Sequence, residues 1–228
     1  MRRLPWIIGA LVVVIVVVIA APYLYRAARG GDDAPAPTVS IDGAEAATGD
    51  LDGSRVVVPG TAPNETSAGY TVDEILRGEP VTVVGSTSEV SGEATISGTV
   101  LESASFDVQV AGIETDINRR DEQARSPQIL DAGAHPFATL TVAEPVDLAS
   151  VPTDGTTASI PMEIDLTIKG TTVREEIEVT VLRTGDTLIA SGAVPLTWAE
   201  VGVEPPSLGF VAVEPSGTID FLVSLARR

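Results

Sequence analysis

The stretch TASIPMEIDLTIKGTTVREEIEVTVLR, residues 157–183, decides the fold. Between positions 160 and 168, Ile, Met and Leu recur at every second residue, and Pro, Glu, Asp and Thr stand between them. After Lys169-Gly170 the alternation returns from Ile177 to Val181. Apolar residues with a period of two are typical of a strand that buries one face. The stretch therefore predicts two long antiparallel strands joined by a tight turn at Lys169-Gly170.

The same alternation spreads over most of the chain beyond Arg55. Further strands are predicted at 81–88, 91–100, 104–110, 137–144, 187–198 and 219–225. With about eight or more antiparallel strands, the domain is predicted to be all-β, either a barrel or a sandwich. Strands as long as 187–198 favour a closed up-and-down, lipocalin-like barrel, because closure leaves no exposed edge. The polar segment 118–126 interrupts the rhythm and predicts one short helical insert.

Acidic side chains dominate the chain beyond its N-terminal part. Four of the 14 basic residues lie in residues 1–30, which contain no acid, so ten basic side chains face 32 acidic ones in the remainder. Such a surface repels phosphate groups, and nucleic-acid binding is not expected. The absence of Cys excludes thiol catalysis, and a single His, His135, argues against a histidine metal site or a catalytic triad. We expect no cofactor, no metal and no enzymatic activity.

The N-terminal part contains a run of 21 uncharged residues from Leu4 to Leu24. A helix of this length covers ~30 Å, which is enough to cross the hydrocarbon core of a bilayer. The run predicts one transmembrane helix, a signal anchor, within residues 1–29. A cleaved signal peptide is the competing interpretation, since Ala20-Ala21 offers small residues for cleavage. Both interpretations predict that the C-terminal domain lies outside the cytoplasm, and the first predicts a single-pass protein of the cell membrane.

The predicted organisation has three parts. Residues 1–29 form a cytoplasmic tip and the transmembrane anchor. Residues 30–50 are rich in Gly, Ala, Pro and Asp, and are interpreted as a flexible, extended linker. Residues 51–228 form the β-barrel domain.

Five motifs, in a fixed order, carry a resemblance to a known family. They are AGYTVD at 68–73, VVGSTSEVSGEATISGTV at 83–100, SFDVQVAGIETDINRRD at 105–121, HPFATL at 135–140 and DLTIKGTTV at 165–173. Together they resemble the YceI-like family of extracytoplasmic, lipocalin-type barrels of the bacterial cell envelope, which is associated with polyisoprenoid and amphiphile binding. Two departures stand out. Many members carry a histidine where this chain has Gln123, and an aromatic pair where it has Ile129-Leu130.

The resemblance implies a lipophilic ligand inside the barrel, and the alternation of the strands supplies candidate residues. An eight-stranded barrel is just wide enough either to be filled by side chains or to hold one small ligand, so the residues alone leave both interiors open. The candidates for the apolar lining are Tyr70, Phe106, Val108, Val110, Phe137, Ile164, Leu166, Ile168, Trp198 and Phe221.

Three arginines form the basic cluster of an acidic domain: Arg119, Arg120 and Arg125. A guanidinium at the mouth of the barrel could bind a phosphate or carboxylate head group. The alternative is ion pairing with the acids at helical spacing, which are Asp116, Asp121 and Glu122. Arg120 and Asp121 match an Arg-Asp motif of the family, and they are therefore the candidates for contact with a polar head group.

The expected function is a membrane-tethered binding protein that holds a lipophilic molecule, such as a polyisoprenoid, without transforming it. A second hypothesis is a cell-envelope interaction module with a solid barrel core, whose acidic face contacts a protein. A third is a hydrolase. The interior of the barrel discriminates between the first two, because binding needs a cavity and the interaction module does not.

Overall fold

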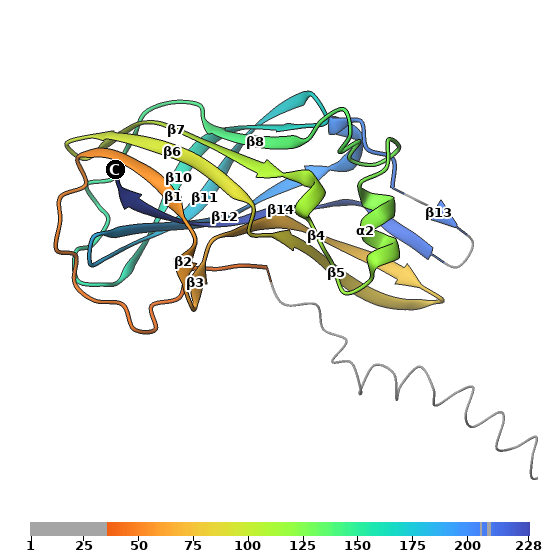
Figure 1. The fold of residues 1–228 in the computed structure, drawn as a ribbon, viewed down its shortest axis with the longest axis horizontal. Helices are drawn as coiled ribbons and strands as arrows, with labels where there is room; N and C mark the ends of the chain where they lie inside the picture. Colours follow the sequence, from red (N-terminus) through yellow and green to blue (C-terminus); the bar gives the residue numbers. More distant parts are fainter. Residues whose placement is uncertain (1–35, 206, 209–210) are drawn as a thin grey trace, which may run out of the picture. The chain divides into compact units, whose positions relative to one another are not determined.

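The computed structural model describes residues 36–205, 207–208 and 211–228 (Figure 1). The transmembrane helix predicted within residues 1–29 lies outside these residues. Within the described ranges, no helix combines the length and apolar character needed to cross a membrane. Pro35–Arg228 forms one compact unit with its own hydrophobic core, and this unit is described by itself below.

Strands make up most of the unit. They are β1 (Gly53–Val58), β2 (Gly60–Thr61), β3 (Asn64–Glu65), β4 (Ser67–Leu76), β5 (Glu79–Thr87), β6 (Val90–Ser97), β7 (Val100–Gln109), β8 (Phe137–Val142), β9 (Val146–Asp147), β10 (Thr157–Ile168), β11 (Thr171–Thr184), β12 (Thr187–Thr197), β13 (Ser207–Leu208) and β14 (Val211–Arg227). The helical parts are α2 (Asn118–Ala124) and two 3-10 turns, η1 (Val110–Gly112) and η2 (Trp198–Val201). The predicted all-β fold with one short helical insert is confirmed.

The main sheet closes on itself into an antiparallel barrel. Its order is β1-β6-β7-β8-β10-β11-β12-β14, and β14 pairs back with β1, where Val57 lies opposite Leu225. The other half of β14 pairs with β4, which continues β1 along the same edge, and β5 likewise runs on into β6. Counting each of these end-to-end pairs as one long strand gives eight strands, so the predicted lipocalin-like barrel is confirmed.

The hairpin that the sequence analysis started from has the predicted form. Ile168 of β10 lies opposite Thr171 of β11, and Lys169 and Gly170 form the turn between them. Both turn residues have positive φ angles, 51° and 78°, which matches the right-handed twist of a two-residue hairpin. The apolar residues of β10 from Ile160 to Ile168 are all buried in the barrel. Alternation in the sequence therefore became alternation between core and surface.

Large rings inside the barrel pack against glycines on the neighbouring strand. The directly opposite pairs are Tyr70 with Gly85, Phe106 with Gly92, and Phe221 with Gly192. A Cβ atom at these glycines would lie 2.7, 2.8 and 2.9 Å, respectively, from the opposing ring. Each ring thus occupies the space that a side chain of the facing residue would take. As a result, the rings lie along the wall of the barrel.

Residues 39–50 lie against the outside of the barrel. The Val39 N–H donates to Ser191 Oγ (3.1 Å), and Ser40 exchanges two hydrogen bonds of 2.8 Å with the Asn64 side chain. Val39 also packs on an outward-facing apolar cluster, Leu182, Ile189 and Leu222. These side chains would otherwise face water, so the chain covers them. Part of the segment that was predicted to be a flexible, extended linker over 30–50 therefore lies against the barrel.

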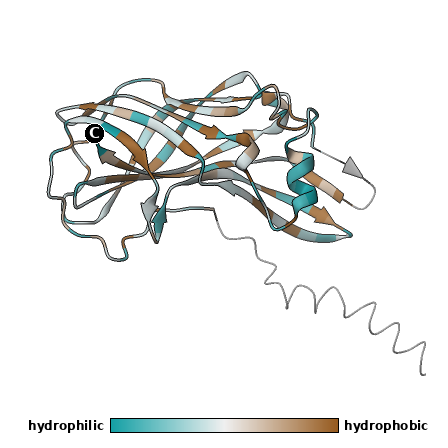
Figure 2. Ribbon diagram, viewed as in Figure 1, coloured by the Kyte–Doolittle hydropathy of each residue, from teal (hydrophilic) through white to brown (hydrophobic). Residues whose placement is uncertain are grey.

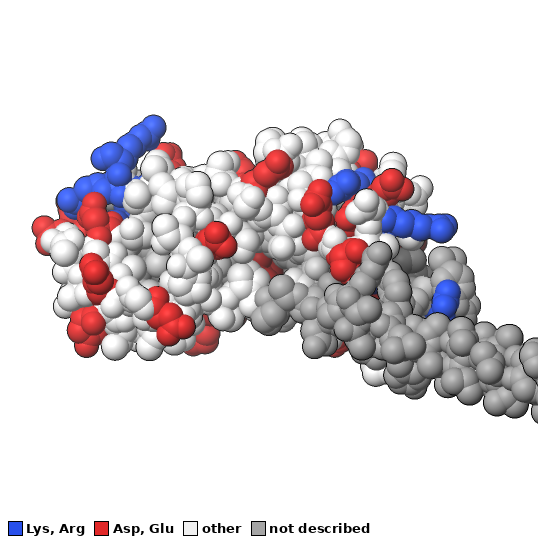
Figure 3. All heavy atoms as spheres, turned by 60° about the horizontal axis from the view of Figure 1, so that its bottom comes forward, with Lys and Arg blue, Asp and Glu red and all other residues white. Residues whose placement is uncertain are grey.

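Most of the acidic side chains lie on the surface of the unit, and Glu74, Asp121 and Asp220 are the buried ones among the described residues. Figure 3 shows acidic side chains spread over the face in view, whereas Lys and Arg gather toward the two ends. Strands show apolar residues alternating with polar ones along their length (Figure 2). The acidity of this face is therefore distributed as in a solvated surface and forms no single patch.

Candidate binding site

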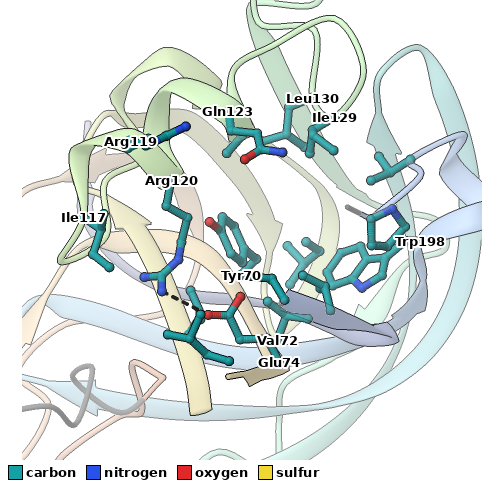
Figure 4. Close-up of a pocket in the computed structure, with 18 of the residues that line it drawn as sticks. Tyr70, Val72, Glu74, Ile117, Arg119, Arg120, Gln123, Ile129, Leu130 and Trp198 are labelled. Atoms are coloured by element: carbon teal, nitrogen blue, oxygen red, sulfur yellow. Dashed lines mark hydrogen bonds and ion pairs between the residues drawn. The ribbon is translucent and has the colours of Figure 1, made fainter. Parts of the chain in front are cut away.

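An apolar cavity of about 510 Å³ opens at the end of the barrel where α2 lies (Figure 4). This volume falls within the ~300–1,000 Å³ that is usual for small-molecule sites. Its walls come from β4, β5, the end of β10, β14, α2, the loop after α2 and the η2 segment. Aliphatic side chains make up most of the lining, and Tyr70 and Trp198 are the rings among the described residues.

The cavity exists because one part of the barrel wall is not a strand. β7 ends at Gln109 and β8 begins at Phe137, so the chain leaves the sheet between them. This excursion is joined to β5 by a pair of backbone hydrogen bonds, in which Ser86 and Glu114 exchange N–H and C=O groups at 2.9 and 3.0 Å. α2 covers the gap, and its Ala124 faces the interior without filling it.

β4 supplies one side of the cavity through its alternation. Tyr70, Val72, Glu74 and Leu76 all line the cavity, because successive residues of a strand point to opposite faces. Glu74 is the charged member of this row, and it is only 6% exposed. A carboxylate in such an apolar surrounding needs a partner.

Arg120 of α2 is that partner. Its Nη2 lies 3.2 Å from Glu74 Oε1, and its Nη1 donates to Asp116 Oδ1 at 2.6 Å. Figure 4 shows the Arg120–Glu74 contact bridging α2 and β4 at the cavity wall. Both sides of the guanidinium are therefore engaged by carboxylates. For Arg120, the structure favours the ion-pair interpretation over head-group binding.

Other polar groups at the rim have no such partner. Arg77, Arg119 and Gln123 line the cavity, and no ion pair joins either arginine to another described residue. Arg119 and Gln123 project from α2 toward the cavity side (Figure 4). These side chains are the groups available to a polar head.

Asp121 has a structural role instead of the predicted contact with a head group. It is 5% exposed and does not line the cavity. Its Oδ1 accepts hydrogen bonds from the Thr115 N–H (2.9 Å) and the Thr115 hydroxyl (2.7 Å). Arg125 reinforces the same region, because its Nη2 donates to the Ile113 carbonyl at 2.9 Å. Both residues hold the segment that leads into α2.

The predicted apolar lining is distributed over three regions. Tyr70, Ile168 and Trp198 line the large cavity. Deeper in the barrel, a second cavity of about 60 Å³ is lined by Phe106, Val108, Val110, Leu166 and Phe221, and also by Tyr70 and Ile168. Ile164 is buried but lines neither cavity, because it packs in the filled part of the core.

Phe137 is a correction to the predicted lining. It is 51% exposed, and it lies opposite Gln109 on β7, an outward-facing position. The inward residues of β8 are Ala138 and Leu140, which lie opposite Val108 and Phe106. The alternation of β8 therefore runs one residue out of step with the prediction.

Several lining residues were missed by the sequence analysis. The row on β4 could have been found by continuing in steps of two from Tyr70, which reaches Val72 and Glu74. Leu130 from the loop and Val201 from η2 carry no local signal, because only the packing of distant segments brings them to the cavity. Over the described part of the chain, no three His, Asp or Glu side chains gather closely enough to hold a metal ion.

Comparison with known proteins places this geometry in a family. Residues 61–225 match the model of the YceI-like domain. A polyisoprenoid binding domain from Saccharophagus degradans, implicated in plant cell wall breakdown, aligns with a TM-score of 0.60 and 16% identity, over 77% of this chain and 98% of that one. BcnA of Burkholderia cenocepacia aligns with a TM-score of 0.51 and 21% identity, over 68% and 95% of the two chains. A search of curated proteins finds no match. Since the family model covers more than half of the sequence, the chain belongs to the YceI-like domain family.

Proposed function

We propose that the protein binds a lipophilic small molecule, such as an isoprenoid chain with a small polar head, and holds it unchanged in the barrel. The observation that carries this proposal is the apolar cavity of about 510 Å³. Burial of each methylene contributes ~0.8 kcal/mol, so a chain of a few isoprene units is enough for tight binding. The fold shared with a polyisoprenoid binding domain supports the same class of ligand.

The distribution of polar and apolar side chains around the cavity predicts the orientation of the bound ligand. The polar groups Arg77, Arg119 and Gln123 lie at the cavity, and Trp198 and Ile168 are buried apolar parts of its wall. A polar head would contact the rim formed by α2 and the β4–β5 turn. The apolar chain would then extend into the barrel past Trp198.

The predicted N-terminal anchor fits this role. A helix within residues 1–29 would tether the barrel outside the cytoplasm, close to the leaflet in which a lipophilic ligand resides. The competing function, an interaction module with a solid core, requires close packing throughout the interior. The cavity argues against it.

Trp198 provides a direct test. The two tryptophans of the chain are Trp6 and Trp198, so a fragment of residues 36–228, which spans the compact unit, contains only the one that lines the cavity. Titration with farnesol is expected to change the Trp198 fluorescence to saturation at a stoichiometry of one. A fragment that unfolds cooperatively but shows no saturable change with any isoprenoid alcohol would contradict the proposal.

A pair of variants gives the matched control. Ala124→Phe places a ring in the cavity and is expected to weaken farnesol binding about tenfold or more, since an occupied volume cannot take the ligand. Ala134→Phe adds the same ring at an exposed loop position, and the affinity should stay unchanged. Equal affinities of the two variants for farnesol would show that the ligand binds outside this cavity.

A further inference from the structure

The deeper cavity of about 60 Å³ is separated from the large cavity by side chains alone. Four residues line both cavities: Tyr70, Leu130, Ile168 and Ile219. They come from β4, the loop after α2, β10 and β14, and so converge on one level of the barrel from different directions. Among the described residues, the side chains of these four border both spaces. A change in these side chains is therefore sufficient to join them.

Tyr70 has the largest side chain of the four, and its ring packs against the barrel wall. Its ring lies against Gly85 of β5, where a Cβ atom would come within 2.7 Å of Cε1 and 2.8 Å of Cζ. Tyr70 is half-buried, whereas Ile168 is 4% exposed and fixed in the core. One face of the Tyr70 ring therefore packs against Gly85, and the other side of the ring borders the cavity.

The deeper cavity suits an apolar chain end. Phe106, Leu166 and Phe221 are among the apolar side chains that line it. The charged residues beside it are directed elsewhere: Lys169 Nζ donates to the Gln128 and Gly202 carbonyls at 3.3 and 3.1 Å. Asp220, on the outward face of β14, accepts a hydrogen bond of 2.6 Å from the Thr71 hydroxyl. The surface of the deeper cavity is almost entirely apolar.

We propose that the deeper cavity is an inner chamber for the far end of an apolar chain, and that Tyr70 is the partition that limits the chain length. This inference rests on the proposed function. In the wild-type protein the outer cavity accommodates a chain up to the Tyr70 ring. Loss of the ring joins the two spaces, and a longer chain then buries its last unit among Phe106, Leu166 and Phe221.

The test measures affinity against chain length in fragment 36–228, with Trp198 fluorescence as the readout. Geraniol, farnesol and geranylgeraniol differ from one to the next by one isoprene unit. For the wild type, affinity is expected to rise and then level off along the series. For Tyr70→Ala, the longest alcohol should gain about tenfold or more over farnesol, because the added unit is now buried. Tyr70→Phe keeps the ring and should follow the wild type.

Three results would overturn the inference. The first is a plateau at the same chain length in folded Tyr70→Ala and in the wild type. The second is an equal gain for geranylgeraniol in the wild type, which would show that the ring is no partition. The third is the absence of binding of every alcohol to the wild type, which overturns the proposed function itself. Leu130→Ala opens another side of the partition and should also extend the accepted length, so the test stands even where Tyr70→Ala does not fold.

Discussion

The two ends of the barrel are built from the same strands, but one is filled and the other is hollow. At the filled end, β1 closes against both β6 and β14, and inward side chains such as Ile96, Met162, Ile164 and Leu225 are buried against one another. At the hollow end, the inward residues of β4 and of the first half of β14 surround a cavity of about 510 Å³. Both sets consist mostly of medium-sized aliphatic residues, so composition does not explain the difference.

The difference comes from the wall. At the filled end the wall consists of paired strands throughout, and a barrel of eight strands is narrow enough for side chains to meet at its axis. At the hollow end, α2 and its flanking loops replace a part of that wall between β5 and β8. A helix carried on loops stands off from the axis, and the cavity lies between its side chains and those of β14. A local interruption of strand pairing therefore creates the site.

The largest expected effect is a contrast in stability between the two ends. Ile164→Ala removes a side chain that is 1% exposed in the filled end and should lower the free energy of unfolding by about 2–5 kcal/mol. Ile129→Ala removes a partly buried side chain that faces the cavity and should cost less than about 1 kcal/mol, because it loses few contacts. Urea unfolding of fragment 36–228 measures both. Equal losses would show that the hollow end is as tightly packed as the filled one.

The second-largest expected effect on stability concerns the ion pair that attaches α2 to β4. Glu74→Leu and Arg120→Leu each leave a charge without this partner in a largely buried position, and each should cost about 2–3 kcal/mol. The double variant removes both charges and should recover most of the loss, since apolar residues can replace an ion pair of this kind. The coupling free energy from the double-mutant cycle is the measurement. Additive losses would mean that Glu74 and Arg120 do not hold the helical wall to β4.

The sequence predicts those features of the two ends that depend on neighbouring residues better than those that depend on distant ones. The alternation from Ile160 to Ile168 predicted strand, turn and inward face, because a long run of Ile and Leu against charged residues fixes the parity. β8 is short and reads Phe-Ala-Thr-Leu-Thr-Val, where small and semi-polar residues give little contrast, so Phe137 was assigned to the wrong face. Which residues of a strand face inward is predicted from its local alternation, and this prediction is unreliable for a strand as short as β8.

The cavity itself depends on non-local packing. Trp198 and Tyr70 were predicted to line the interior, and they meet at the large cavity although 128 positions separate 70 from 198. Leu130 and Val201 lie in irregular segments, and their positions follow from how those segments fold over the barrel end. For the arginine cluster the sequence left both ion pairing and head-group contact open, and the contacts of Arg120 with Glu74 and Asp116 favour ion pairing for that residue.

The smallest effect lies outside both ends, on the outer face of the β10–β11 hairpin. The Arg174 guanidinium donates two hydrogen bonds of 2.7 Å to Asp165, and these hydrogen bonds hold the pKa of that carboxyl below its usual value. A carboxyl with a lowered pKa in the folded state stabilises the protein at pH values above its unfolded pKa. That stabilisation is lost as the pH falls through the folded pKa.

Arg174 is exposed and Asp165 is partly exposed, so water screens the pair and its contribution is small compared with that of Ile164 or Glu74. Asp165→Asn should therefore leave the stability at neutral pH nearly unchanged. Its unfolding midpoint in urea should fall less steeply than that of the wild type as the pH is lowered below about 4, the ordinary range of an aspartate. Glu163→Gln removes an exposed carboxyl from the same strand and is the matched control. The pair lies on the outer face of the barrel wall, so Asp165→Asn should leave the farnesol affinity unchanged. A change in affinity would mean that the outer face of the hairpin is coupled to the hollow end.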